Sequence, residues 1–162
     1  MKEKDNKNFI IDHSDYVFRI ICGDQTRPTN TLVFGDSDNW LEVNTFNDSH
    51  EISSIDCMYT NNIVNEEYLL YDYTKIPDIK NYYSVCSYYE EDTAEDFTIN
   101  LHKDELDIML NRFLDPSYYY VDGRIQYYYD DDLLLLYIKV VDLTEEEYNY
   151  FYNLYLSESI SK

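Results

Sequence analysis

Glycine is scarce in this chain of 162 residues, which contains only Gly23, Gly35 and Gly123. Loops that bind phosphate groups need several glycines close together, so that backbone amides can surround the phosphate. No such segment can be built from three widely spaced glycines. The sequence therefore argues against most nucleotide-dependent enzymes.

Cysteine and histidine are also few. Cys22, Cys57 and Cys86 are odd in number and form no Cys-x-x-Cys pair, and the three histidines show no zinc-ligand spacing. Neither a disulfide framework nor a zinc site is expected, and each cysteine is predicted to be a buried free thiol. With no catalytic motif present either, we expect a protein that is not an enzyme and that needs no metal or cofactor.

Basic residues are outnumbered, since 12 Lys and Arg face 33 Asp and Glu, which gives a net charge of −21. Such a chain repels the phosphates of nucleic acids and of anionic membranes. The longest aliphatic run, from Leu133 to Val141, contains Lys139 and is too short to span a bilayer, and the first residues lack the apolar stretch of a signal peptide. We expect a cytoplasmic protein, in the host cytosol if the source is a virus or phage, with no direct contact with nucleic acid or membrane.

Base composition alone does not explain the acidity. The abundance of Asn, Ile and Tyr and the scarcity of Ala, Gly, Pro and Arg follow from AT-rich codons, but lysine codons are AT-rich too and the chain has only eight lysines. Solubility of a small domain requires a net charge of only about 2–8. The excess of acid therefore indicates a functional cause.

The first two thirds of the chain predict β-strands, because short runs of β-branched and aromatic residues alternate with turn residues. The segment LVFGDSDNWLEV predicts one hairpin. A second is predicted where Tyr118–Val121 and Arg124–Tyr129 flank Asp122-Gly123, a pair typical of type I′ turns. The other expected strands are Phe9–Ile11, Tyr16–Cys22, Thr31–Phe34, Trp40–Asn44, Ile52–Tyr59, Tyr68–Tyr73 and Tyr82–Tyr89.

The last third shows what looks like an internal repeat of strand, cap and helix, in Thr98–Leu114 and again in Val140–Leu156. Both copies carry apolar residues at the i, i+3, i+4, i+7 spacing of one helical face, which predicts helices over 103–114 and 144–157. Thr144 followed by Glu147 forms a capping box. Two amphipathic helices after two strands resemble each other anyway, so duplication and coincidence are both open.

These patterns predict an α+β fold, in which a mainly antiparallel sheet of about seven to ten strands packs against the two helices. More than a quarter of the residues are Leu, Ile, Val or Phe, enough for a folded core. We expect one domain over 1–162, with a possible subdivision into a β-rich part, 1–95, and the β–α repeat, 96–162.

Tyrosine is abundant, with 20 residues, and is interleaved with acid. Successive strand residues point to opposite faces, so at least one ring of a Tyr-Tyr-Tyr triplet faces away from the other two. A surface of tyrosine rings and carboxylates suits a partner rich in Arg and Lys. The alternative, that the tyrosines replace Phe and Leu in the core, stays open. The predicted contact residues are Tyr127, Tyr128, Tyr129, Asp130, Asp131 and Asp132, followed by Tyr88, Tyr89, Glu90, Glu91 and Asp92.

Charge and size together favour an acidic inhibitor that mimics nucleic acid. It would bind the basic, nucleic-acid-contacting surface of a partner such as a nuclease, as anti-CRISPR and other phage or viral anti-defence proteins do. An immunity protein that neutralises a nuclease toxin is the first alternative. A viral host-interaction module that binds through a protein groove is the second, and a hydrolase with an unrecognised carboxylate pair is the third.

Overall fold

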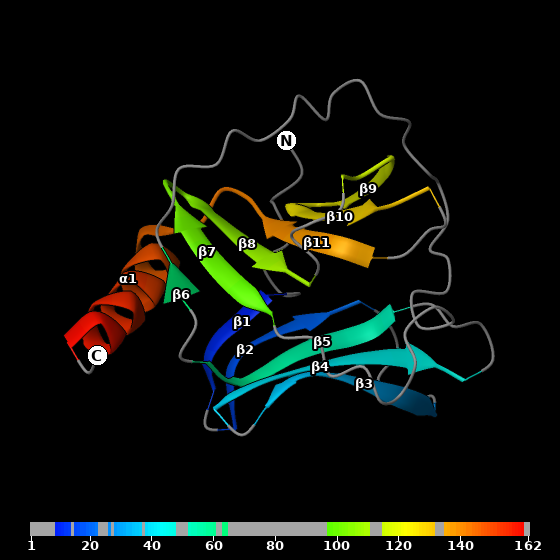
Figure 1. The fold of residues 1–162 in the computed structure, drawn as a ribbon, viewed down its shortest axis with the longest axis horizontal. Helices are drawn as coiled ribbons and strands as arrows, with labels where there is room; N and C mark the ends of the chain where they lie inside the picture. The colour runs from blue at the N-terminus through cyan, green and yellow to red at the C-terminus, as the bar shows by residue number, and fades with distance from the viewer. Residues whose placement is uncertain are drawn as a thin grey trace. The chain divides into compact units, whose positions relative to one another are not determined.

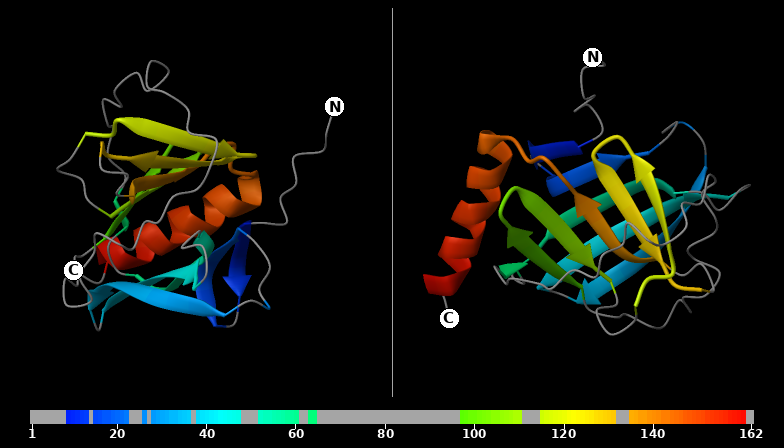
Figure 2. Two further views of the ribbon diagram at one scale, coloured as in Figure 1. Left: turned by 90° about the vertical axis from the view of Figure 1, so that its right-hand side faces the viewer. Right: turned by 90° about the horizontal axis from the view of Figure 1, so that it is seen from above.

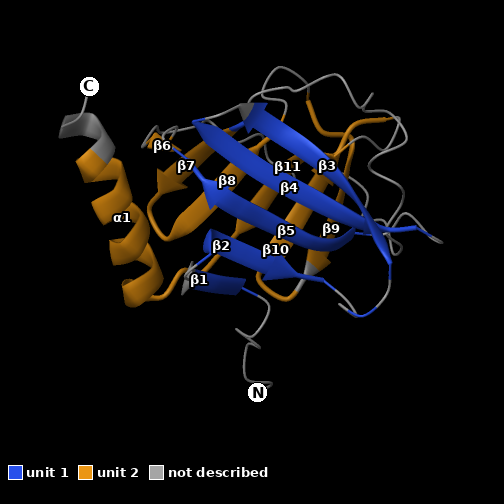
Figure 3. Ribbon diagram, turned by 90° about the horizontal axis from the view of Figure 1, so that it is seen from below, with its two compact units in different colours: residues 1–60, 81–97 blue, residues 61–80, 98–162 orange. Residues whose placement is uncertain are grey.

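The computed structural model describes residues 9–13, 15–22, 26, 28–36, 38–47, 52–60, 63–64, 97–110, 115–131 and 135–160. The chain forms two compact units (Figure 3). Unit 1 comprises Met1–Thr60 with Asn81–Phe97, and unit 2 comprises Asn61–Lys80 with Thr98–Lys162. Whether the chain behaves as one domain stays a prediction.

Unit 1 contains a five-stranded antiparallel sheet with the strand order β1-β2-β5-β4-β3 (Figure 1). Its strands are β1 (Phe9–His13), β2 (Tyr16–Ile21), β3 (Thr29–Asp36), β4 (Asn39–Phe46) and β5 (Ile52–Tyr59). They confirm the first five predicted strands and the hairpin over LVFGDSDNWLEV. The strands predicted over Tyr68–Tyr73 and Tyr82–Tyr89 lie outside the described residues.

The alternation along these strands divides the sheet into an apolar and a polar face. Phe18, Cys57 and Leu41 lie side by side on β2, β5 and β4, and all three are fully buried. The next row along the same strands is Arg19, Asp56 and Glu42, whose side chains point to the opposite face. Cys57 is thus the buried free thiol that the sequence predicts, whereas Cys22 is only half-buried.

The β3–β4 hairpin requires a glycine and holds the single tryptophan. Gly35 has a φ of 101°, and a Cβ there would lie 1.8 Å from the backbone oxygen of Asn39, which no side chain can tolerate. Trp40 follows on β4, where its indole N–H donates to Glu42 Oε1 at 3.0 Å and its ring lies 6.4 Å from that of Tyr59. The indole is therefore held by groups of unit 1.

The described residues of unit 2 form a six-stranded sheet with the order β6-β7-β8-β11-β10-β9 and one helix. Among the described strands, β6 and β7 pair in parallel and all other neighbours pair antiparallel. The helix packs beside β6 and β7, as Figure 2 shows, and it confirms the predicted helix over 144–157. The elements are β6 (Ile63–Val64), β7 (Thr98–His102), β8 (Glu105–Met109), β9 (Tyr118–Asp122), β10 (Ile125–Tyr129), β11 (Leu135–Val140) and α1 (Glu145–Ile160).

The helix predicted over 103–114 is wrong, and with it the α+β class with two helices and the strand–helix repeat. Residues 105–109 form strand β8, so Thr98–His102 and Glu105–Met109 make a hairpin. Leu106 and Ile108 also fit a period of two, and they pair with Leu101 and Ile99 on β7. On its other side β8 pairs with β11. Pairing on both sides outweighs a weak helical preference. The described part of the chain is a mostly β structure with two sheets and one helix.

The β9–β10 hairpin is confirmed, but its turn lies one residue later than predicted. Asp122 pairs with Ile125, so the two loop residues are Gly123 and Arg124. Gly123 has a φ of 60° and Arg124 has no positive φ, which is the φ pattern of a type II′ turn with glycine first. The shift moves Arg124 from the strand into the turn.

Candidate functional site

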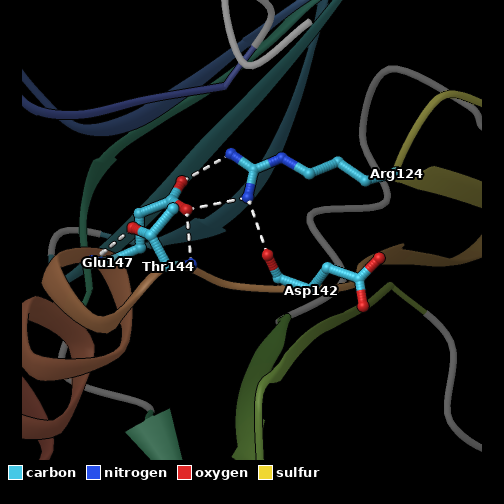
Figure 4. Close-up of polar contacts among 4 residues, drawn as sticks. All are labelled: Arg124, Asp142, Thr144 and Glu147. Atoms are coloured by element: carbon cyan, nitrogen blue, oxygen red, sulfur yellow. Dashed lines mark hydrogen bonds and ion pairs between the residues drawn. The ribbon is translucent and has the colours of Figure 1, made fainter. Parts of the chain in front are cut away.

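The Arg124 side chain reaches from the β9–β10 turn to the first turn of α1 (Figure 4). Its Nη1 donates to Glu147 Oε1 at 2.7 Å and its Nη2 donates to Glu147 Oε2 at 2.6 Å. Both side chains are almost fully buried, with exposed fractions of 4% and 8%. Such a two-pronged contact fixes both the distance and the orientation of the two groups.

The same carboxylate caps the helix. The Thr144 backbone N–H donates to Glu147 Oε1 at 2.9 Å, and the Glu147 N–H donates to Thr144 Oγ1 at 3.2 Å, which confirms the predicted capping box. Burial pushes the pKa of Glu147 upward, but the hydrogen bonds from Arg124 and Thr144 outweigh burial and hold it below its usual value. Glu147 is therefore a charged group whose carboxylate oxygens accept hydrogen bonds from Arg124 and Thr144 inside the protein.

Exposed carboxylates surround this buried pair. Arg124 Nη1 also donates to the backbone oxygen of Asp142 at 3.3 Å, while the Asp142 carboxylate points away from the guanidinium (Figure 4). The Leu143 N–H donates to the Asp104 backbone oxygen at 2.8 Å, which brings the β7–β8 turn to the same place. We call this region the acidic end; its exposed carboxylates are those of Asp104, Asp142, Glu145 and Glu146.

A second charged cluster lies on β8 and β11. Lys139 Nζ is 3.3 Å from Glu105 Oε2 and 3.9 Å from Asp107 Oδ1, and the Lys139 and Asp107 side chains are both buried. Burial raises the pKa of Asp107 to about 6, although Lys139 acts in the opposite direction. Asp107 Oδ1 accepts no hydrogen bond from the described residues. Among the described acids of unit 2, Asp107 is the one whose pKa is raised.

A third ion pair lies on the polar face of unit 1. Arg19 Nε is 2.9 Å from Asp56 Oδ1, and Asn44 donates from Nδ2 to Asp56 Oδ2 at 3.1 Å. Burial raises the pKa of Asp56, and the Arg19 charge reduces that rise. Asp56 is buried, whereas a quarter of the Arg19 side chain is exposed.

These three pairs use most of the positive charge of the described residues. Arg19, Arg124 and Lys139 are each bound to an acid of their own unit, and Lys103 is the one exposed base in the described ranges. The exposed acids there are Asp15, Asp38, Asp104, Asp115, Asp131, Asp142, Glu145 and Glu146. The described surface therefore presents charge of nearly one sign.

The predicted contact residues are only partly at the surface. Tyr127, Tyr128 and Tyr129 are at most 5% exposed, so for this triplet the structure agrees with the alternative that the tyrosines belong to the core. The sheet is buried on both faces at β10, which lies between β9 and β11. Asp130 is half-buried and Asp131 is exposed. Asp132 lies outside the described residues, as do Tyr88, Tyr89, Glu90, Glu91 and Asp92.

Sequence reasoning missed the buried cations. Lys139 interrupts an aliphatic run, and Arg124 follows the turn glycine. A charge within an apolar run is a signal that the structure supplies a counter-ion, because an unpaired buried charge is very costly. The partners themselves, Asp107 and Glu147, are not predictable from spacing, because they come from other elements.

No three His, Cys, Asp or Glu side chains among the described residues are grouped so that they could hold a metal ion. The one described helix is also not long and apolar enough to cross a membrane. A comparison with known protein families finds no match, and a search of curated proteins finds no significantly similar sequence.

Proposed function

We propose that this protein is an acidic inhibitor that binds the basic, nucleic-acid-contacting surface of a partner protein and excludes DNA or RNA from it. A phage or viral anti-defence protein, such as an anti-CRISPR, is the class that we favour. One observation carries the proposal: the net charge is −21, and three of the four described basic residues are bound to acids within their own units.

The pairing of basic side chains with acids inside each unit affects how strongly the protein attracts a basic partner. A cation at the surface would cancel neighbouring carboxylates and weaken the field that a basic partner meets. Arg124 and Lys139 are instead buried, and they stabilise the fold next to acids that are also buried. The net negative charge of the exposed carboxylates then attracts a basic partner over a distance of about one Debye length, roughly 8–10 Å at physiological salt.

The test is competition with DNA on a panel of purified basic proteins: CRISPR effector nucleases, restriction endonucleases, DNA glycosylases and toxin nucleases. We expect one of them to bind the protein at about 50 mM salt, to release duplex DNA on binding, and to lose affinity steeply as salt rises. Inhibition of a toxin nuclease alone would assign the immunity protein instead. Binding that ignores salt and leaves DNA bound would contradict the proposal.

A charge variant sharpens this test. Neutralising the acidic end should slow association and flatten its salt dependence, because steering depends on charge rather than on shape. The variant combines Asp104→Asn, Asp142→Asn, Glu145→Gln and Glu146→Gln. The matched control changes four exposed amides without changing charge: Asn30→Gln, Asn47→Gln, Asn149→Gln and Asn153→Gln.

A further inference from the structure

Strand β9 forms an edge of the six-stranded sheet. It pairs with β10 on one side, and no described strand pairs with it on the other. Edge strands carry a row of backbone N–H and C=O groups that can pair with another chain. The backbone groups of β9 that point away from β10, and the side chains around them, determine which chain could pair with this edge.

The turn determines which backbone groups of β9 point outward. In a two-residue turn, the Asp122 C=O accepts from the Ile125 N–H, so this pair is hydrogen-bonded. Hydrogen-bonded and non-hydrogen-bonded pairs alternate along an antiparallel ladder. The pairs of Tyr120 and Tyr118 with β10 are therefore bonded as well. The N–H and C=O groups of Tyr119 and Val121 point away from β10.

This edge lacks the features that usually prevent pairing. β9 contains no lysine and no proline, and its register with β10 shows no shift. Val121 is one of three large apolar residues that are exposed in the described part of the chain, at 41%. The edge strand β3 of unit 1 differs, because polar Thr29, Asn30 and Thr31 are its exposed residues.

The surroundings of β9 favour a basic occupant. The Ser117 N–H donates to the Tyr129 backbone oxygen at 2.7 Å, which places the start of β9 next to the end of β10. Exposed Asp115 and Asp131 therefore belong to the same end of the hairpin. The half-buried Tyr119 ring stacks on Tyr128 at 6.3 Å and offers a face for a guanidinium group.

We propose that β9 accepts an extended segment of the partner as an additional β-strand, and that this segment carries Arg or Lys at alternate positions. Backbone groups of Tyr119 and Val121 supply its hydrogen bonds, and Asp115 and Asp131 pair with its cations. A second copy of this chain is disfavoured because both would carry a charge of −21. The proposal rests on the proposed function and names the part of the partner that is bound.

Amide hydrogen exchange tests the open edge directly. The probe is a short, end-blocked peptide in which arginine alternates with valine and threonine, and the control peptide has glutamate in place of arginine. In the free protein, the Tyr119 and Val121 amides should exchange faster than that of Tyr120, which bonds to β10. Saturating basic peptide should slow both by at least about tenfold, and the acidic peptide should not.

Three outcomes would overturn the proposal. The first is equal protection of Tyr119, Val121 and Tyr120 in the free protein, which would mean that the edge is already paired. The second is protection that grows with protein concentration without peptide, which would assign a second copy. The third is unchanged exchange at saturating basic peptide.

Proline substitution removes an outward donor and leaves the ladder with β10 intact. Val121→Pro should weaken peptide binding by about tenfold or more, because one hydrogen bond is lost and the peptide backbone is obstructed. Val33→Pro is the matched control, since the same alternation points the Val33 N–H outward on β3. Val121→Thr keeps the N–H and should bind within about threefold of wild type. If Val121→Pro does not fold, Val121→Thr provides the test instead. Loss of peptide binding in Val121→Thr would contradict a role for the Val121 backbone, because this variant keeps the backbone N–H.

The two proposals fail separately. If Val121→Pro displaces DNA from the partner as well as wild type does, the proposed function stands and the β9 proposal is wrong. If the peptide adds to β9 but no member of the protein panel is bound, strand addition stands and the proposed inhibitor function is wrong.

Discussion

Unit 2 buries two ion pairs that differ in how completely their charges are satisfied. Glu147 accepts two hydrogen bonds from Arg124 and one from the Thr144 backbone. Asp107 has Lys139 at 3.9 Å and shares it with Glu105. The pKa of Glu147 is therefore lowered, while burial raises that of Asp107 to about 6. Burial alone does not determine how an acid contributes to stability; the number of hydrogen bonds to its charged form does.

The largest loss of unfolding free energy is expected when the Arg124–Glu147 ion pair is broken. Glu147→Ala leaves the Arg124 guanidinium buried without its carboxylate and removes the cap of α1. Loss of one partner of a buried pair costs about 3–5 kcal/mol of unfolding free energy. Urea unfolding followed by far-ultraviolet circular dichroism measures this loss.

Glu146→Ala is the control for that variant, because Glu146 is the exposed neighbour on the same helical turn. It should change the unfolding free energy by less than about 1 kcal/mol. Equal losses in the two variants would mean that the Arg124–Glu147 pair contributes nothing beyond helix charge.

The contribution of the Lys139–Asp107 pair is tested by measuring the unfolding free energy as a function of pH. The folded protein holds a proton on Asp107 up to a pKa of about 6, whereas the unfolded chain releases it near 3.8. Raising the pH through this window therefore destabilises the folded state, by about 2–3 kcal/mol between pH 4 and pH 7. Asp107→Asn lacks this titration. The unfolding free energy of wild type relative to the variant should fall by that amount over the same range.

Asp104→Asn serves as the control, since Asp104 is exposed in the adjacent turn. The difference between Asp107→Asn and wild type should change with pH by more than the difference between Asp104→Asn and wild type. Equal changes in the two differences would show that Lys139 compensates the Asp107 charge fully. The contrast between the two ion pairs would then disappear.

The smallest loss of unfolding free energy is expected when the Thr144 hydroxyl, which caps α1 beside the Arg124–Glu147 pair, is removed. Thr144→Ala removes the hydroxyl that accepts the Glu147 N–H at 3.2 Å but leaves Arg124 bonded to Glu147. A loss of about 1 kcal/mol is expected in urea unfolding. Thr144→Ser keeps the hydroxyl and should lie within about 0.5 kcal/mol of wild type. A loss as large as that of Glu147→Ala would show that cap and ion pair form one unit.

Local signals in the sequence predicted the five described strands of unit 1, the β9–β10 hairpin and α1 correctly. They failed at 103–109, where Leu106 and Met109 fit a helical pattern while Leu106 and Ile108 fit an alternating one. The pairing of β8 with β7 and β11 decides between these patterns, and such pairing between distant segments is not visible in a local window.

The candidate site was less predictable than the fold. The sequence left exposed and core positions both open for Tyr127, Tyr128 and Tyr129, and the structure buries all three because β10 is buried on both faces. Their neighbours in sequence, Asp130 and Asp131, do reach the surface to differing extents. Exposure depends on what covers a sheet, which the alternation of residues along a strand does not reveal.

The position of Trp40 gives the protein a built-in optical probe. It is the only indole among 162 residues and belongs to unit 1, where Glu42 and Tyr59 hold it. Fluorescence excited selectively at the indole therefore reports on the part of unit 1 where β4 lies beside β3 and β5, without any introduced label. Melting of unit 2 that leaves this emission unchanged would show directly that the two units unfold independently.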